Sequence, residues 1–334
     1  MKSLLSWFVL VVSIAILISS CAKSDDSKTA STASTDNTTP TDTTAPSVFV
    51  VVGTLGTIVR STDNGSSFDN VTSPTANNLK GVTFGNKTFV GVGFSGNIVR
   101  STDNGSSFDN VTSPTANNLN GVTFGNDTFV GVGGSGNIVR STDNGASWDN
   151  ASSPTATNLN GVTFGNNILL GVGDNGNIVR STDNGASWDN ATSPTGNHLR
   201  AVTFGNEIFV GVGYSGNIVR STDNGLSFDN VTSPTSSSTA NRLTGVAFGT
   251  NTFVALGQSG YIVRSTDNGA SWDNVTSPTA NNLKGVTFGN KTFVGIGLSG
   301  NIVRSTDNGL QNGASWDNGT SQTTNNINGI TFSE

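Results

Sequence analysis

One unit of 40 residues repeats along the chain from residue 48 onward. It reads GVTFGNxTFVGVGxSGNIVRSTDNGxSxDNVTSPTANNLx, and two intervals lengthen to 44 because extra residues fall near Ser236–Ser238 and in Leu310–Gly313. The copies start at Gly81, Gly121, Gly161, Ala201, Gly245, Gly285 and Gly329. A period near 40 residues with several short strand signals is typical of β-propeller blades. A helical repeat would need apolar residues at a 3.6-residue period, which the unit lacks.

Each unit predicts four short strands. In the copy that begins at Gly81 they are residues 81–84, 88–93, 97–102 and 108–113, which are rich in β-branched and aromatic residues. Gly-Asn, Ser-Gly-Asn, Asp-Asn-Gly and Ser-Pro-Thr sequences separate the strands, and these residues favour tight turns. Four antiparallel strands per unit, repeated radially, predict one propeller blade.

The repeat count and the chain ends together predict a closed ring. The sequence Ser-Thr-Asp-Asn-Gly begins at residues 61, 101, 141, 181, 221, 265 and 305. Residues 49–52 align with the second strand of the unit and residues 329–332 with the first. The C-terminal strand can therefore complete the N-terminal blade and cover edges that would otherwise stay open. We expect an all-β domain over 48–334, a seven-bladed β-propeller of four-stranded antiparallel blades.

Composition narrows the classes of function. The charged residues make up 11% of the chain, and 18 Phe and 5 Trp indicate a packed core rather than a disordered chain. A net charge of −6 disfavours non-specific binding of nucleic acid. The single Cys and single His disfavour a disulfide framework, a metal site and a His-based proton relay. We therefore expect no cofactor, no metal and no nucleic-acid partner.

The first 21 residues resemble a bacterial lipoprotein signal. Lys2 is followed by an uncharged stretch of 15 residues, 4–18, which is short for a spanning helix and typical of a signal peptide. The sequence Ile18-Ser19-Ser20-Cys21 resembles a lipobox. The resemblance implies a signal peptide over 1–20 and lipidation of Cys21, and the Ser/Thr/Asp-rich residues 21–47 then form a disordered tether. An ordinary signal peptide or a short membrane helix is the alternative.

The repeated motif resembles the Asp-box, or BNR repeat, with the pattern S-x-D-x-G-x-[ST]-[WF]. Six copies are intact, as in residues 141–148, and the insertion after Gly309 splits the seventh. The Asp can accept backbone hydrogen bonds and hold the turn, so we interpret these residues as structural rather than as calcium ligands or catalytic groups. They are Asp63, Asp103, Asp143, Asp183, Asp223, Asp267 and Asp307.

Within the Asp-box propellers, the longer pattern G-x-S-G-N-I-V-R-S-T-D-N-G is most similar to photosystem II assembly and stability factors. That resemblance implies a chaperone-like role in assembling a membrane complex. Sialidases, xyloglucan-cleaving glycosidases and sortilin-like receptors share the box. In a lipoprotein of a Gram-negative bacterium, Ala22 after the lipidated Cys would imply sorting to the outer membrane.

Two positions differ from copy to copy. One is the turn between the second and third strands, and the other precedes each first strand. In an up-and-down blade both turns open on the same face of the ring, opposite the Asp-boxes. We expect this face to bind a partner, although drift of exposed hairpin tips would give the same pattern. The candidate residues are Phe94, Asp174, Tyr214, Gln258, Leu298, Lys80, Arg200, Arg242 and Lys284, of which Phe94, Tyr214 and Leu298 would be the apolar anchors.

The acidic residues that lie outside the repeat positions are too few and too scattered to favour an enzyme. Outside those positions, residues 48–334 hold only four acidic residues, Asp127, Asp174, Glu207 and Glu334. A glycosidase needs two carboxyls roughly 5–10 Å apart, and Asp127 and Glu207 belong to blades two steps apart. His198 reads as a solvated loop residue. Each third strand also has an Arg, such as Arg60. We expect these seven residues to pair with box carbonyls or with Asp69 and its equivalents. The alternative is that they form a basic ring that binds an anion.

These observations predict a non-enzymatic, monomeric propeller that is anchored to the bacterial cell envelope through its lipid alone and acts as a binding or assembly scaffold. The expected partner is an envelope protein or a cell-surface glycan. The alternative functions are a glycan-binding or sialidase-like glycoside hydrolase propeller, or a surface repeat protein without one fixed partner.

Overall fold

The computed structural model describes residues 47–234, 241–305 and 316–333. These belong to the compact unit Ala45–Glu334. Cys21, the expected signal and nearly all of the tether lie outside the described residues, as do Asp307 and most of the split seventh box. Within the described ranges, no helix is long and apolar enough to cross a membrane.

Each repeat forms four antiparallel strands joined by tight turns. In the first complete repeat these are β4 (Leu79–Gly85), β5 (Thr88–Gly93), β6 (Ile98–Ser101) and β7 (Asp109–Val111). A 3-10 turn, η2 (Phe94–Gly96), joins β5 to β6. The first strand begins at Leu79, two residues before the predicted start, and a bulge lies between Leu79 and Gly81. A bulge leaves one residue unpaired and redirects its side chain.

The other repeats contain equivalent strands. The first strands are β8 (Leu119–Gly125), β12 (Leu159–Gly165), β16 (Leu199–Gly205), β20 (Leu243–Gly249), β24 (Leu283–Gly289) and β28 (Ile327–Phe332). The second strands are β1 (Phe49–Gly53), β9 (Thr128–Gly133), β13 (Ile168–Gly173), β17 (Ile208–Gly213), β21 (Thr252–Gly257) and β25 (Thr292–Gly297).

The third strands are β2 (Ile58–Ser61), β10 (Ile138–Ser141), β14 (Ile178–Ser181), β18 (Ile218–Ser221), β22 (Ile262–Ser265) and β26 (Ile302–Ser305). The fourth strands are β3 (Ser67–Val71), β11 (Asp149–Ala151), β15 (Asp189–Asn190), β19 (Asp229–Val231), β23 (Asp273–Val275) and β27 (Trp316–Ser321). The remaining 3-10 turns are η1 (Thr54–Gly56), η3 (Gly134–Gly136), η4 (Asp174–Gly176), η5 (Tyr214–Gly216), η6 (Gln258–Gly260) and η7 (Leu298–Gly300).

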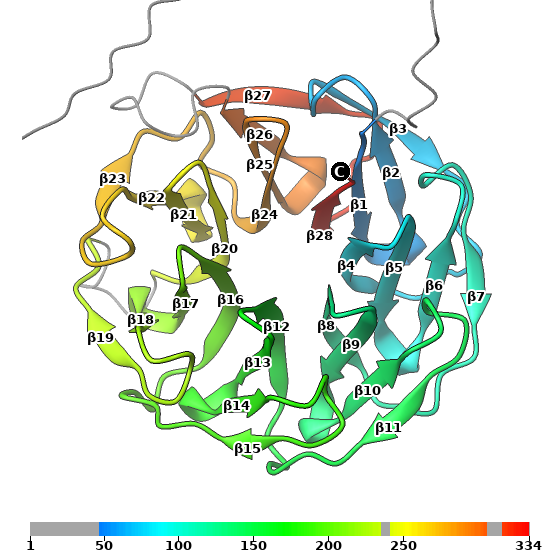
Figure 1. Cartoon of the computed structure of the whole chain (residues 1–334). Helices are drawn as coiled ribbons and strands as arrows, with labels where there is room; N and C mark the ends of the chain where they lie inside the picture. Colours follow the sequence, from blue (N-terminus) through cyan, green and yellow to red (C-terminus); the bar gives the residue numbers. More distant parts are fainter. Residues whose placement is uncertain (1–46, 235–240, 306–315, 334) are drawn as a thin grey trace, which may run out of the picture. The chain divides into compact units, whose positions relative to one another are not determined.

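The described strands form five four-stranded sheets and one eight-stranded sheet. Figure 1 shows the sheets following one another around a ring, with the first strands innermost. In the eight-stranded sheet, β28 pairs antiparallel with β1, so that Phe332 faces Phe49, and the short parallel pairing of β27 with β3 joins two four-stranded arrays at their outer edges. Among the described residues, the prediction of an all-β domain built from repeated four-stranded antiparallel sheets is confirmed.

The core lies between neighbouring sheets. Every residue of the second strand β5 is buried, because sheets cover both of its faces. Val90 and Val92 of β5 pack with Phe129 of β9, Val139 of β10 and Trp148 of the following box. Burying one such side chain contributes about 1.5–3 kcal/mol to stability. Six other clusters of the same kind occur among the described residues, and each joins two neighbouring repeats.

Glycine lets the innermost strands approach closely. A Cβ atom built on Gly329 of β28 would lie 2.8 Å from the carbonyl oxygen of Lys80 and 3.0 Å from the Cα of Gly81 in β4. A Cβ on Gly81 would in turn lie 3.2 Å from the Cα of Gly121. Six of the seven units therefore have a glycine where a side chain would lie close to the next sheet, and the seventh has the small residue Ala201.

The third-strand arginines connect neighbouring sheets. The Arg140 Nε donates a hydrogen bond to the carbonyl oxygen of Asn184, 2.7 Å away, in the box of the following repeat. The Nε atoms of Arg60, Arg100, Arg180 and Arg220 make the same bond, at 2.7–2.8 Å. The acceptor is thus a box carbonyl, the first of the two predicted partners, but it belongs to the next sheet rather than to the arginine's own.

Candidate functional site

The position before each predicted first strand occupies the bulge of that strand. Lys80 lies between Leu79 and Gly81, where the register of β4 against β5 shifts, and Arg200 and Lys284 lie at the matching shifts of β16 and β24. The bulge leaves these residues without a backbone partner opposite them. As a result, the residues that vary between repeats at this position project from the inner strands at one end of the ring.

The two variable positions contact each other within one repeat. The Lys80 ammonium lies 4.7 Å from the centroid of the Phe94 ring. In the repeat that contains Arg200, the guanidinium carbon lies 4.5 Å from the centroid of the Tyr214 ring. Each pair is separated by fourteen residues, so the bulge of the first strand and the η turn of the same repeat form one surface.

This surface surrounds a pocket of about 300 Å³. Basic residues come to it from three first strands and from the segment before β20, and Tyr214 and Gln258 come from two η turns. Neutral polar side chains at the other bulges complete the wall. The lining residues are Lys80, Asn120, Asn160, Arg200, Tyr214, Arg242, Thr244, Gln258, Lys284 and Asn328. We call this end of the ring, with the nine candidate residues of the sequence analysis, the mouth.

The structure brings some of the predicted residues together and keeps others apart. Lys80, Arg200, Arg242, Lys284, Tyr214 and Gln258 line the pocket, whereas Phe94, Asp174 and Leu298 lie on turns beside it. Of the three expected apolar anchors, Tyr214 therefore lines the pocket, whereas Phe94 and Leu298 lie beside it.

Positive charge accumulates in the pocket. Burial lowers the pKa of the Lys80 ammonium, and the nearby charges of Lys284 and Arg200 lower it further. Of the residues that line the pocket, none is acidic. Like charges held close together in a partly buried site repel one another, and this repulsion favours the neutral form of Lys80.

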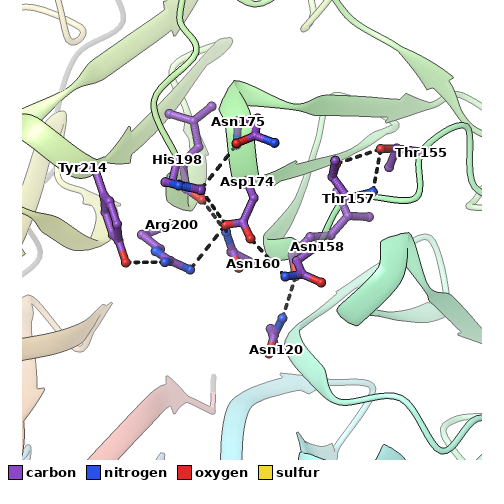
Figure 2. A network of polar contacts seen from close by, with 12 residues as sticks. Asn120, Thr155, Thr157, Asn158, Asn160, Asp174, Asn175, His198, Arg200 and Tyr214 are labelled. Carbon is purple, nitrogen blue, oxygen red and sulfur yellow. Dashed lines mark hydrogen bonds and ion pairs between the residues drawn. The ribbon is translucent and has the colours of Figure 1, made fainter.

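Asp174 is the centre of a polar network beside the pocket. Its carboxylate accepts hydrogen bonds from the Nδ2 atoms of Asn158 and Asn160, at 3.0 and 2.9 Å, and lies 3.7 Å from the Arg200 guanidinium (Figure 2). Burial alone would raise the pKa of Asp174. The two amide hydrogen bonds and the charges of Arg200 and His198 outweigh burial and hold this pKa below its usual value.

His198 belongs to the same network, whereas its sequence context predicted only a solvated loop residue. Its Nδ1 lies 3.0 Å from the Asp174 carboxylate, and its ring meets the Tyr214 ring edge-on with centroids 5.1 Å apart. The Asn175 backbone N–H also approaches this nitrogen, at 3.4 Å. The position of His198 in the repeat was the available signal, because other repeats have Asn there.

That position normally stabilises a strained turn. The Oδ1 of Asn118 accepts a hydrogen bond from the backbone N–H of Ser95, 2.9 Å away, and Ser95 has a positive φ of 55°. Asn78, Asn158, Asn282 and Asn326 do the same for other η turns. Arg242 takes this place in its repeat and cannot accept a hydrogen bond. Its guanidinium carbon instead lies 4.0 Å from the Tyr214 ring centroid.

The Asp-box loops connect the third and fourth strands at the opposite end of the ring. The Asp143 carboxylate accepts hydrogen bonds from the Ser147 hydroxyl at 2.6 Å, the Ser147 backbone N–H at 2.9 Å and the Ser141 hydroxyl at 2.8 Å. The Ser147 bonds are the main cause that lowers the pKa of Asp143 to about 2. Among the described residues, no group of three or more His, Cys, Asp or Glu side chains is placed to hold a metal ion.

Comparison with known proteins identifies the fold. No family model and no curated protein matches the chain. Among solved structures, YCF48 bound to a D1 peptide is similar with a TM-score of 0.57 at 16% identity, over 82% of this chain and 84% of that one. YCF48 from Cyanidioschyzon merolae gives 0.60 at 18%, over 76% and 89%. A nidogen–laminin complex gives 0.56 at 10%, over 86% and 98%. At these identities the similarity shows the fold alone.

Proposed function

We propose that this chain is a non-enzymatic scaffold that binds a protein partner at the mouth of a seven-bladed ring. One observation carries the proposal: the side chains that differ between nearly identical repeats meet at one end of the ring, around one pocket. Pairing of β28 with β1, and the close approach of Gly329 to Gly81, support closure of the ring by the C-terminal strand.

The chemistry of the mouth favours binding over hydrolysis. Asp174 is the acidic residue beside the pocket, and its carboxylate is engaged by Asn158, Asn160, Arg200 and His198. The low pKa that results makes Asp174 a poor general acid. The structure of YCF48 with a D1 peptide concerns a different protein, but it supports a peptide or protein partner for a propeller of this kind.

The place of action is proposed from the sequence. Lipidation of Cys21 would hold the propeller at the bacterial cell envelope, on a tether over 21–47, and Ala22 favours the outer membrane. The repeated Asp-box pattern supports a relationship to BNR-repeat propellers, and the longer motif supports the photosystem II assembly factors among them. We expect a monomer, with the lipid as its contact with the membrane.

The experiment is affinity capture from solubilised envelope with the full chain, compared with the variant Phe94→Ser/Tyr214→Ser/Leu298→Ser. Leu226→Ser is the matched control, because Leu226 is an exposed apolar residue (59% exposed) on a box loop at the other end of the ring. The proposal predicts a protein that the native chain and the control both retain and the mouth variant loses. Equal capture by all three would place the site elsewhere, and capture of no protein would contradict the proposal.

A further inference from the structure

The seven bulge positions divide into two chemical groups. At four of them a short neutral side chain donates a hydrogen bond to the carbonyl oxygen of a leucine in the next sheet. The bonds run from Asn120 to Leu159 at 2.9 Å, and from Asn160 to Leu199, Thr244 to Leu283 and Asn328 to Leu79 at 2.8 Å. These four residues therefore join neighbouring sheets.

The other three bulges have Lys80, Arg200 and Lys284 instead. For the two ammonium groups, no hydrogen bond or ion pair is found in the part of the chain that the structure describes. The positive charge of Arg200 is partly compensated, because its guanidinium lies 3.7 Å from the Asp174 carboxylate and donates a hydrogen bond to the Tyr214 hydroxyl. Three repeats have thus replaced a bond between sheets with a positive charge in the pocket.

Arg242 adds a fourth positive charge and an independent sign of a missing ligand. Its Nε atom is buried and has no hydrogen-bond partner within the described ranges. Its guanidinium stacks on one side of Tyr214 while Arg200 also contacts that ring, so the aromatic ring holds both cations in place. A buried donor without an acceptor lowers stability, and an acceptor arriving from solution would relieve that cost.

The arrangement selects for a compact ligand with several acceptor atoms. The cations come from β4, β16, β24 and the segment before β20, so they approach the pocket from different sides of the ring. A tetrahedral phosphate offers oxygens in all these directions, whereas a carboxylate presents two in one plane. Guanidinium and ammonium groups are the side chains that bind phosphate most often. A pocket of about 300 Å³ has room for more than one phosphate group.

We propose that the mouth pocket binds a phosphate-class anion with two or more negative charges, held by Lys80, Lys284, Arg242 and Arg200. This inference rests on the proposed function, because it assigns a ligand chemistry to the same face. The lowered pKa of Lys80 is consistent with it, because a bound anion would remove the repulsion that disfavours the charged form.

Calorimetry with inorganic pyrophosphate tests the inference. The native full chain is compared with the bulge variant Lys80→Asn/Lys284→Asn. This variant has Asn at both bulges, as the chain already has at Asn120, Asn160 and Asn328, so the fold is preserved. Lys87→Asn/Lys291→Asn is the matched control, because these lysines lie in the β4–β5 and β24–β25 turns, at the opposite end of the same first strands. We expect saturable binding of pyrophosphate to the native chain. The affinity should fall at least tenfold in the bulge variant and less than twofold in the control, and it should also fall as the salt concentration rises.

Absence of saturable binding to the native chain, or equal weakening in the control, would overturn the inference. Citrate that binds as tightly as pyrophosphate would overturn the assignment to phosphate. Arg242→Gln provides a second variant with the same expectation. If the chain captures a partner but does not bind pyrophosphate, this inference is refuted and the proposed function stands. If the chain binds pyrophosphate but captures no partner, the proposed function is contradicted and this inference stands. Release of a captured partner by phosphatase treatment would show that the partner carries the phosphate, and retention would leave a free phosphate compound as the ligand.

Discussion

The ammonium of Lys80 lies over the ring of Phe94, 4.7 Å from its centroid. The two residues belong to different variable positions of the repeat, and in this repeat the two positions are in contact. The same relation joins Arg200 to Tyr214, and Asn160 to Asp174 through a hydrogen bond of 2.9 Å. In these three repeats the two variable side chains touch, which supports a built surface over independent drift of two loops.

Replacement of Lys80 by Asn should stabilise the fold. An Asn there can donate to the carbonyl oxygen of Leu119, as Asn120 does to that of Leu159, and the change removes repulsion from Lys284 and Arg200. We expect the free energy of unfolding to rise by about 1 kcal/mol. Urea denaturation measures the change, and Lys87→Asn should alter stability by less than about 0.5 kcal/mol. A loss of stability in Lys80→Asn would contradict this reading of the bulge.

Replacement of Arg140 by Gln should destabilise the fold. The substitution removes the hydrogen bond from its Nε to the Asn184 carbonyl oxygen, which joins two neighbouring sheets. Since the donor is charged, the expected loss is about 1.5–3 kcal/mol. Arg242→Gln is the matched control, because the Nε of Arg242 has no acceptor within the described residues, and it should cost less than Arg140→Gln. Equal melting temperatures for the two variants would refute the prediction.

Replacement of Gly329 by Ala tests the contact between β28 and β4. The new Cβ would lie 2.8 Å from the Lys80 carbonyl oxygen, so one strand has to move. We expect a loss of about 1–3 kcal/mol in the free energy of unfolding, as for other overpacked sites. Gly196→Ala is the control, since a Cβ there meets nothing within 4 Å. A Gly329 variant as stable as the control would contradict the expected clash between β28 and β4.

Stability should fall in acid between about pH 4 and pH 2. The box carboxyls of Asp143, Asp183 and Asp267 have pKa values of about 2 in the folded chain, against 3.8 as the ordinary value. A folded-state pKa below the unfolded one favours the folded state above pH 3.8, and this contribution disappears as the pH falls through about 2.

Ser147→Ala gives the matched test of that acid transition. Its hydroxyl donates the 2.6 Å hydrogen bond that is the largest cause of the low Asp143 pKa. In the variant the Asp143 pKa should move back toward 3.8, so this carboxyl should contribute less stability and complete its loss at a higher pH in acid titrations followed by tryptophan fluorescence. Ser152→Ala, an exposed serine after β11, should follow the native curve. Coincident curves for all three proteins would show that the box bonds do not govern the transition.

The repeat made most of the fold predictable. Strand order follows from the period and from turn residues such as Asp103-Asn104-Gly105, which act locally. Contacts between units were harder to foresee, because they depend on how the sheets pack around the ring. Arg140 reaches the next box rather than its own, and Leu79 begins the first strand two residues early because a bulge intervenes. His198 joins Asp174 for the same reason: the two residues come from successive repeats.

The most direct test of the binding mouth is a chain in which two repeats lose their distinctive mouth residues. Lys80→Asn/Phe94→Gly/Arg200→Asn/Tyr214→Gly copies the pair Asn120 and Gly134 into those two repeats, so it replaces two contact pairs of the mouth with residues that the fold already accepts. Capture of the partner from solubilised envelope is measured for this variant and for the native chain, with melting temperature as the check on folding. Our account predicts a folded variant that no longer retains the partner. Undiminished capture by the folded variant would contradict it.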